Sequence, residues 1–114
     1  MYRRGLGLSE IGRFQDHQGF DGVLLGEPGR GYHLEFAYCR AHPVVPTPTP
    51  EDQLVFYIDD PGEWKTACLS MAEAGFADVA AFNPYWHQRG RTFEDHDRYR
   101  TVLVQAPWRS GQRP

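Results

Sequence analysis

The sequence predicts an α+β domain in which strands outnumber helices. Several stretches alternate apolar and polar residues with the period of two that is typical of half-buried strands, and one stretch has helical spacing with a marked start. A proline-rich segment, residues 39–52, divides the 114 residues into two halves of similar length. At this length we expect a single domain with one hydrophobic core.

The first half, residues 1–38, predicts three strands that follow a short helical end. Gly5 and Gly7 are typical of positions where a helix stops. Strands are expected at residues 9–16, 20–25 and 32–38, with turn residues between them. The third strand alternates strictly, so its Tyr, Leu and Phe side chains share one face, and His33 and Glu35 share the other.

The proline-rich segment contains four prolines between Pro43 and Pro50. Such a run favours polyproline II geometry, which makes a semi-rigid connector between the two halves. Recognition by a proline-reading partner domain is the alternative use of this segment.

The second half, residues 53–105, predicts a strand, a helix and three further strands, and a tail follows at residues 106–114. The helix is well marked, because Asp60 can cap it, Pro61 suits its first position and Glu63 has the spacing of a capping box. Its apolar face at helical spacing consists of Trp64, Ala67, Cys68 and Met71.

The end of the second half predicts a short strand at residues 77–82 and a hairpin at residues 91–105. The turn of the hairpin, Asp95 to Arg98, contains Asp side chains that can bond nearby amides. Before the hairpin, Asn83-Pro84-Tyr85-Trp86 predicts a loop. Two roles stay open for Trp86: a lid over a cavity, or a plug that covers the edge of the sheet.

Composition excludes several classes of protein. An apolar fraction of 40% argues against disorder, and no apolar run approaches the roughly 20 residues that span a membrane. No signal peptide is visible, so we expect a cytoplasmic protein in which Cys39 and Cys68 are free thiols. The net charge is −3, and basic residues alternate with acidic ones, so we expect no nucleic-acid partner.

Five short motifs occur in order between Tyr2 and Trp108: Gly-Leu-Gly-Leu, Gly-Tyr-His-Leu-Glu-Phe, Leu-Val-Phe-Tyr-Ile-Asp-Asp, Asn-Pro-Tyr-Trp and Thr-Phe-Glu-Asp-His-Asp. Their order and spacing resemble the vicinal oxygen chelate superfamily of glyoxalases, bleomycin-resistance proteins and extradiol dioxygenases. The resemblance implies paired βαβββ modules that form a curved sheet around a cavity, usually in a dimer. The first module would lack its opening strand and most of its helix.

The resemblance also implies metal-ligand positions on the first and last strands of each module. The first of these four positions would lie on the opening strand that this chain lacks. The other three correspond to Glu35, Gln53 and Val102. Glu35 is a good ligand, Gln53 is a weak one, and a valine cannot bind metal. Because a catalytic divalent ion needs about three protein ligands, we expect no cofactor. A divalent metal at Glu35 and Gln53 stays the alternative.

His33 and Glu35 are two residues apart on the predicted strand, so their side chains point to the same face. They could form a two-point metal site or an acid–base pair. The simpler alternative is a histidine that forms hydrogen bonds within a polar cavity.

The leading functional hypothesis is a small-molecule binding protein, one that binds or sequesters an aromatic natural product or antibiotic. Aromatic walls with a few polar groups suit a planar ligand. The expected lining is His33, Glu35, Gln53, Val55, Tyr57, Trp86, Arg100 and Val102. The alternatives are a metal-dependent lyase, isomerase or dioxygenase of the same superfamily, and a remnant that binds no ligand.

The incomplete first module predicts a homodimer. The strand at residues 32–38 would have an uncovered edge and an uncovered apolar face, which a partner chain could cover. The partner could abut the edge, or the two chains could exchange a segment across the connector. A natural start upstream of Met1 is the alternative explanation of the incomplete module.

Overall fold

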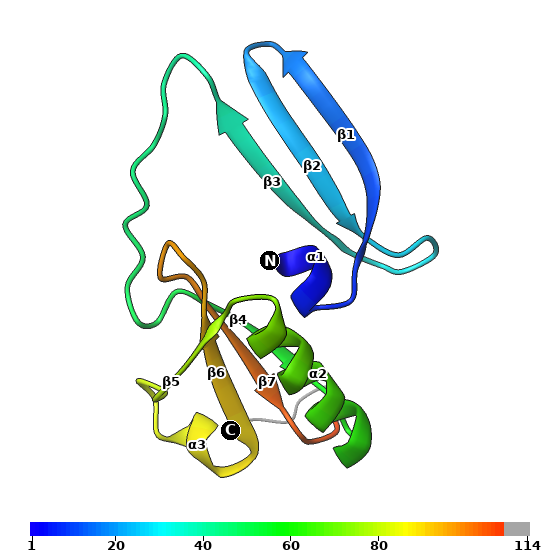
Figure 1. Cartoon of the computed structure of the whole chain (residues 1–114), viewed down its shortest axis with the longest axis vertical. Helices are drawn as coiled ribbons and strands as arrows, with labels where there is room; N and C mark the ends of the chain where they lie inside the picture. Colours follow the sequence, from blue (N-terminus) through cyan, green and yellow to red (C-terminus); the bar gives the residue numbers. More distant parts are fainter. Residues whose placement is uncertain (109–114) are drawn as a thin grey trace.

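The computed structural model describes residues 1–108, and the end of the predicted tail, residues 109–114, lies outside the described residues. The described chain has two sheets and three helices, which confirms the α+β prediction (Figure 1). The elements in chain order are α1 (Tyr2–Gly5), β1 (Ser9–His17), β2 (Phe20–Gly26), β3 (His33–Cys39), β4 (Gln53–Tyr57), α2 (Pro61–Glu73), β5 (Ala77–Val79), α3 (Tyr85–Arg89), β6 (Gly90–Glu94) and β7 (Arg100–Val104).

The first sheet is an antiparallel meander in the order β1-β2-β3. Arg13, Val23 and Phe36 are partners across the three strands, so these side chains lie on one face. Leu24 and Glu35 are partners one position away and lie on the opposite face. Strand β3 is at the edge of this sheet in the described chain.

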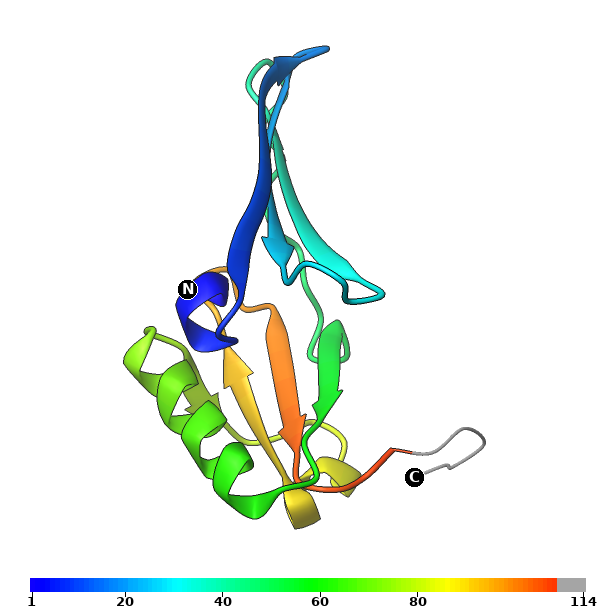
Figure 2. The same cartoon turned by 90° about the vertical axis from the view of Figure 1, so that its right-hand side faces the viewer.

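The second sheet has the order β4-β7-β6-β5, with β4 parallel to β7 and the other pairs antiparallel. Helix α2 connects β4 to β5 and lies along one face of this sheet (Figure 2). Asp60 caps the helix as predicted, because its Oδ2 accepts a hydrogen bond of 2.8 Å from the Glu63 amide. Gly75 follows the helix with φ of +99°, a conformation that suits glycine.

The main core lies between α2 and the second sheet. Cys68 and Met71 pack there against Phe93 and Leu103. The Trp64 indole N–H donates a hydrogen bond of 2.9 Å to the backbone carbonyl of Leu103, which fixes the helix on the sheet. The predicted apolar face of the helix therefore packs on the sheet.

Two local predictions are wrong in the same region. The strand predicted at residues 77–82 extends only from Ala77 to Val79, and the segment predicted as a loop contains the helix α3. The Asn83 side chain accepts a hydrogen bond of 3.0 Å from the Tyr85 amide, and the Asn83 carbonyl accepts one of 3.1 Å from the Trp86 amide. A proline at the start of a helical turn is compatible with these bonds, because it lacks the amide that a first turn leaves unpaired.

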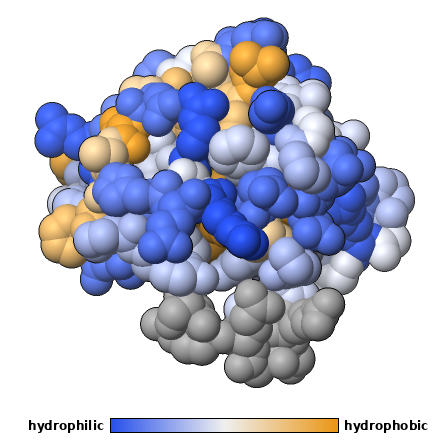
Figure 3. Space-filling view, turned by 90° about the horizontal axis from the view of Figure 1, so that it is seen from below, coloured by the Kyte–Doolittle hydropathy of each residue, from blue (hydrophilic) through white to orange (hydrophobic). Residues whose placement is uncertain are grey.

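The end of the molecule around the second sheet is mainly hydrophilic, with small separate apolar patches (Figure 3). Single exposed apolar side chains are normal on a protein surface. No helix among residues 1–108 has both the length and the apolar character that crossing a membrane requires.

Candidate functional site

The candidate site is a groove of about 720 Å³ between the two sheets. Three segments that are distant in sequence line it, together with the first two residues of the chain. The lining is Met1, Tyr2, Leu34, Glu35, Phe36, Asp52, Gln53, Leu54, Asp95, His96, Asp97, Tyr99 and Arg100. Leu34, Glu35 and Phe36 are consecutive, so their side chains alternate between the two faces of β3. The groove therefore runs along the edge of β3 rather than over one face of the first sheet.

Tyr2 connects the two sides of the groove. Its ring lies 5.0 Å from the Phe36 ring of the first sheet and 5.0 Å from the Phe76 ring of the second module. Its hydroxyl donates a hydrogen bond of 2.6 Å to Asp95 Oδ2. Burial, together with the adjacent Asp95 carboxylate, raises the pKa of the Tyr2 hydroxyl well above its usual range, so Tyr2 stays protonated at neutral pH.

Asp95 holds the turn of the hairpin in place. Its Oδ1 accepts hydrogen bonds of 2.8 Å from the Asp97 amide and 2.9 Å from the Tyr99 amide. The predicted turn from Asp95 to Arg98 is therefore present, and the Arg98 amide bonds the Asp95 carbonyl at 3.1 Å. This turn fixes the positions of Asp97 and Tyr99 on the wall of the groove.

The ionisable side chains of the groove are mostly acidic. Among the described residues, Glu35, Asp52, Asp95 and Asp97 line it, against a single guanidinium, that of Arg100. Arg100 is half-buried, and its Nε lies 3.2 Å from Glu94 Oε2, so its charge is already compensated. Acidic side chains therefore outnumber basic ones in the groove.

The structure brings together only part of the predicted lining. Glu35, Gln53 and Arg100 meet in the groove. His33 is the exposed first residue of β3 and lies opposite Gly26, so it does not line the groove with Glu35. The other predicted residues, Val55, Tyr57, Trp86 and Val102, belong to a packed cluster on the second sheet.

Trp86 fits the role of a plug better than that of a lid. It is only 8% exposed, and it packs against Val102, Val104 and Ala106. Gly90 permits this contact, because a Cβ there would lie 2.5 Å from the Trp86 carbonyl oxygen. In this position α3 covers the face of the second sheet opposite α2.

The residues present do not fit a catalytic metal. Among residues 1–108, no three His, Cys, Asp or Glu side chains are placed so that they could hold an ion. Glu35 and Gln53 both line the groove, but Val102 is fully buried in the cluster under Trp86.

The sequence patterns did not reveal most of the groove residues. Asp52 lies at the end of the connector, and Asp97 lies in a turn, so neither belongs to a periodic pattern. The signal for Tyr2 was equally weak, because α1 has only four residues. The sequence feature that could have pointed to the groove is the presence of acidic residues next to strand ends.

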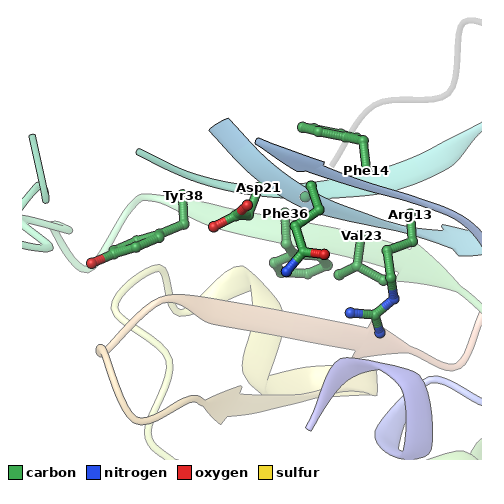
Figure 4. Close-up of a pocket in the computed structure, with 8 residues that line it drawn as sticks. Arg13, Phe14, Asp21, Val23, Phe36 and Tyr38 are labelled. Atoms are coloured by element: carbon green, nitrogen blue, oxygen red, sulfur yellow. The ribbon is translucent and has the colours of Figure 1, made fainter. Parts of the chain in front are cut away.

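A second hollow, of about 380 Å³, lies on the first sheet (Figure 4). The Arg13, Val23 and Phe36 side chains lie on one side of the sheet, and Phe14 lies on the other. Phe36 and Tyr38 in this hollow are 38% and 54% exposed. Tyr2 of α1 contacts Phe36 on this face, whereas Tyr38 keeps most of its apolar surface exposed.

Two solved structures show the fold of this protein. A glyoxylase/bleomycin resistance protein/dioxygenase domain from Frankia sp. EAN1pec superposes with a TM-score of 0.67 at 16% identity, over 93% of this chain and 84% of that one. TnmS3, an antibiotic binding protein from Streptomyces sp. CB03234, superposes with a TM-score of 0.59 at 19% identity, over 93% and 81%. At these identities the likeness shows the fold, which is that of the vicinal oxygen chelate superfamily.

Sequence comparison gives the family. The YycE-like N-terminal domain matches residues 1–37, and the YycE-like C-terminal domain matches residues 51–105. An uncharacterized YycE protein of Bacillus subtilis (strain 168) is 38% identical over 111 residues, which are 97% of this chain and 80% of that protein. A crystal structure of B. subtilis YycE, a protein of unknown function, superposes with a TM-score of 0.86 over 97% of this chain and 81% of that one. The chain belongs to the YycE-like family.

Proposed function

We propose that this protein binds a small organic molecule in the groove between its two sheets. The observation that supports this proposal is the groove itself, whose volume is in the range of ligand sites. Phe36, Leu54 and Tyr99 line it and are 38%, 40% and 40% exposed, and polar side chains line it beside them. Covering such apolar surface would contribute roughly 25 cal/mol per Å² to binding.

An aromatic natural product or an antibiotic is the proposed ligand, and sequestration is the proposed activity. Aromatic rings at Tyr2, Phe36 and Tyr99 offer flat contacts for a planar molecule. The antibiotic binding protein TnmS3 has the same fold, which supports this ligand class as a proposal for the present chain. Val55, Tyr57, Trp86 and Val102 of the predicted lining would take part only after a rearrangement around α3.

A metal-dependent enzyme is the second candidate, because Glu35 and Gln53 do meet in the groove. We expect purified protein to contain no stoichiometric transition metal. Elemental analysis checks this expectation. One equivalent of zinc, iron, manganese or nickel that is lost on Glu35→Ala would favour the enzyme.

A homodimer is part of the proposal. The apolar face of the first sheet around Tyr38, outside the groove, is the surface that a second copy would cover. Sedimentation at low micromolar concentration should show a dimer, with or without exchange of a segment across the connector. A stable, soluble monomer would contradict this part of the proposal.

A thermal-shift screen over aromatic natural products tests the binding function. A ligand of the folded state should raise the melting temperature in a concentration-dependent manner. The variant Leu54→Gln changes an exposed leucine of the groove and should reduce the shift. Leu69→Gln is the matched control, because Leu69 is 62% exposed on α2 and does not line the groove. The proposal fails if no compound raises the melting temperature, or if both variants respond as the wild type does.

A further inference from the structure

We infer that the groove selects organic cations, that is, molecules with a permanently charged ammonium group on a flat apolar body. This inference rests on the proposed function, because it names the ligand class of the same groove. Three features of the groove carry it: the sign of its charge, the carboxylates that are free to bind, and the apolar surface beside them.

The charge of the chain is concentrated in the groove. The chain has a formal net charge of −3. Four carboxylates and one guanidinium line the groove, which gives its side chains the same net charge, with His96 neutral. The formal charges of the remaining side chains therefore sum to zero. A concentration of like charge in one concave region attracts ligands of the opposite sign and repels anions.

Two of the four carboxylates are free to bind a ligand. Asp95 uses both oxygens, for Tyr2 and for two amides of the turn. Asp52 Oδ2 accepts a hydrogen bond of 2.7 Å from the Thr49 amide. Among residues 1–108, the Glu35 and Asp97 side chains have no hydrogen-bond or ion-pair partner. A ligand cation can therefore pair with them without breaking an existing bond.

The one basic side chain that lines the groove in the described part of the chain does not compensate these two acids. Arg100 pairs with Glu94, which is outside the lining. Glu35 comes from β3 and Asp97 from the turn between β6 and β7, so the two free carboxylates belong to opposite sides of the groove. A cation between them would be attracted from both sides.

The apolar surface gives the ligand its second feature. Phe36, Leu54 and Tyr99 are exposed side chains of the same groove as the free acids. A strongly hydrated inorganic cation would gain nothing from these side chains. An organic ammonium ion has an apolar body that covers them, and its charge can also lie over an aromatic face.

Three probes with one ring system test the inference on the full chain: (naphthalen-2-yl)trimethylammonium, 2-naphthalenemethanol and naphthalene-2-sulfonate. Binding is measured by isothermal titration calorimetry at low and at high NaCl. The cation should bind about tenfold more tightly than the sulfonate, since each exposed carboxylate contributes a modest electrostatic preference. Its affinity should fall as salt rises, because salt screens exposed charges.

The isosteric variant Glu35→Gln/Asp97→Asn tests the two free acids. It should remove most of the preference for the cation and leave the affinity for the neutral probe unchanged. Glu73→Gln, an exposed acid at the end of α2 outside the groove, is the matched control and should keep the preference. Each of the three substitutions exchanges a carboxylate oxygen for an amide nitrogen at an exposed side chain, and circular dichroism checks that each variant is folded.

The remaining outcomes separate this inference from the proposed function. If the three probes bind equally, the groove is a ligand site without charge selection, and the inference fails alone. If none binds, both fail. If cation affinity falls as protein concentration rises while sedimentation shows a dimer, a second copy fills the groove, and the inference is wrong.

Discussion

The two sheets share a three-stranded antiparallel meander and differ in what covers it. Strands β1, β2 and β3 repeat the pattern of β5, β6 and β7. The second meander also has β4 beside its last strand and the 13-residue helix α2 on one face. The first has only the four-residue α1 near it. The same kind of meander therefore exists in a covered and an uncovered form within one chain.

The sheet that a long helix covers has more buried apolar side chains than the other sheet. In the described chain, Leu25 is the one apolar side chain of the first sheet that is buried, whereas Phe93, Val102, Leu103 and Val104 are all buried in the second. Free energy of folding from apolar burial is roughly proportional to the area removed from water. The second module consequently holds most of the stability, and the first sheet keeps the exposed apolar surface that the proposed ligand and partner use.

Two phenylalanines, one in each sheet, provide the strongest test of this comparison. Phe93→Ala should lower the free energy of unfolding by about 3–5 kcal/mol, because it leaves a cavity in a fully buried site. Phe20→Ala, at a position in β2 that is 45% exposed, should cost less than about 1 kcal/mol. Urea unfolding measures both. Equal losses would show that the first sheet has a core of its own.

The plug on the other face of the second sheet provides the next test. Trp86→Ala should cost about 3 kcal/mol, the lower end for removal of a large aromatic side chain, because α3 can partly collapse onto the sheet. Phe82→Ala is the control, since Phe82 is 62% exposed a few residues earlier. Urea unfolding compares the two variants. A Trp86 variant as stable as the wild type would favour the lid instead, and the second sheet would then be covered on one face only.

The sequence patterns predicted the elements better than their surroundings. Strict alternation placed Glu35 and Phe36 on opposite faces of β3, and the capping residue Asp60 marked the start of α2; the register and the cap hydrogen bond agree with both. Such patterns depend on neighbours along the chain. The helix α3 was missed because Pro84 is compatible with both a loop and a first helical turn.

The groove could be predicted only in part. The metal-ligand positions that the superfamily resemblance implies include Glu35 and Gln53, and both line the groove. Asp97 and Tyr2 come from a turn and from a very short helix, and their positions depend on how the two sheets lie against each other. Local sequence patterns contain no information about that arrangement, so these residues carry only a weak signal.

Substitution of Tyr2, which connects the two sheets, should change the free energy of unfolding least. It should also change how that free energy depends on pH. Tyr2→Phe keeps the ring contacts with Phe36 and Phe76 and removes the hydrogen bond to the Asp95 carboxylate. We expect a loss of about 1.5 kcal/mol at pH 7, the lower end for a bond to a charged group, because the hydroxyl is only half-buried. Urea unfolding measures it, and Tyr38→Phe, at an exposed position, is the control.

The pH dependence distinguishes the hydroxyl from the ring. In the folded chain the pKa of Tyr2 is raised above its usual value of about 10, which applies to the unfolded chain. At a pH between the unfolded-state pKa and the folded-state pKa, the folded state therefore binds more protons than the unfolded state. The contribution of the hydroxyl is therefore complete below about pH 10 and is lost as the pH rises above it. Wild type should lose stability more steeply than Tyr2→Phe in alkaline urea titrations. Parallel curves would show that the Asp95 bond does not hold Tyr2 between the sheets, and the ring contacts of Tyr2 would then be what holds it there.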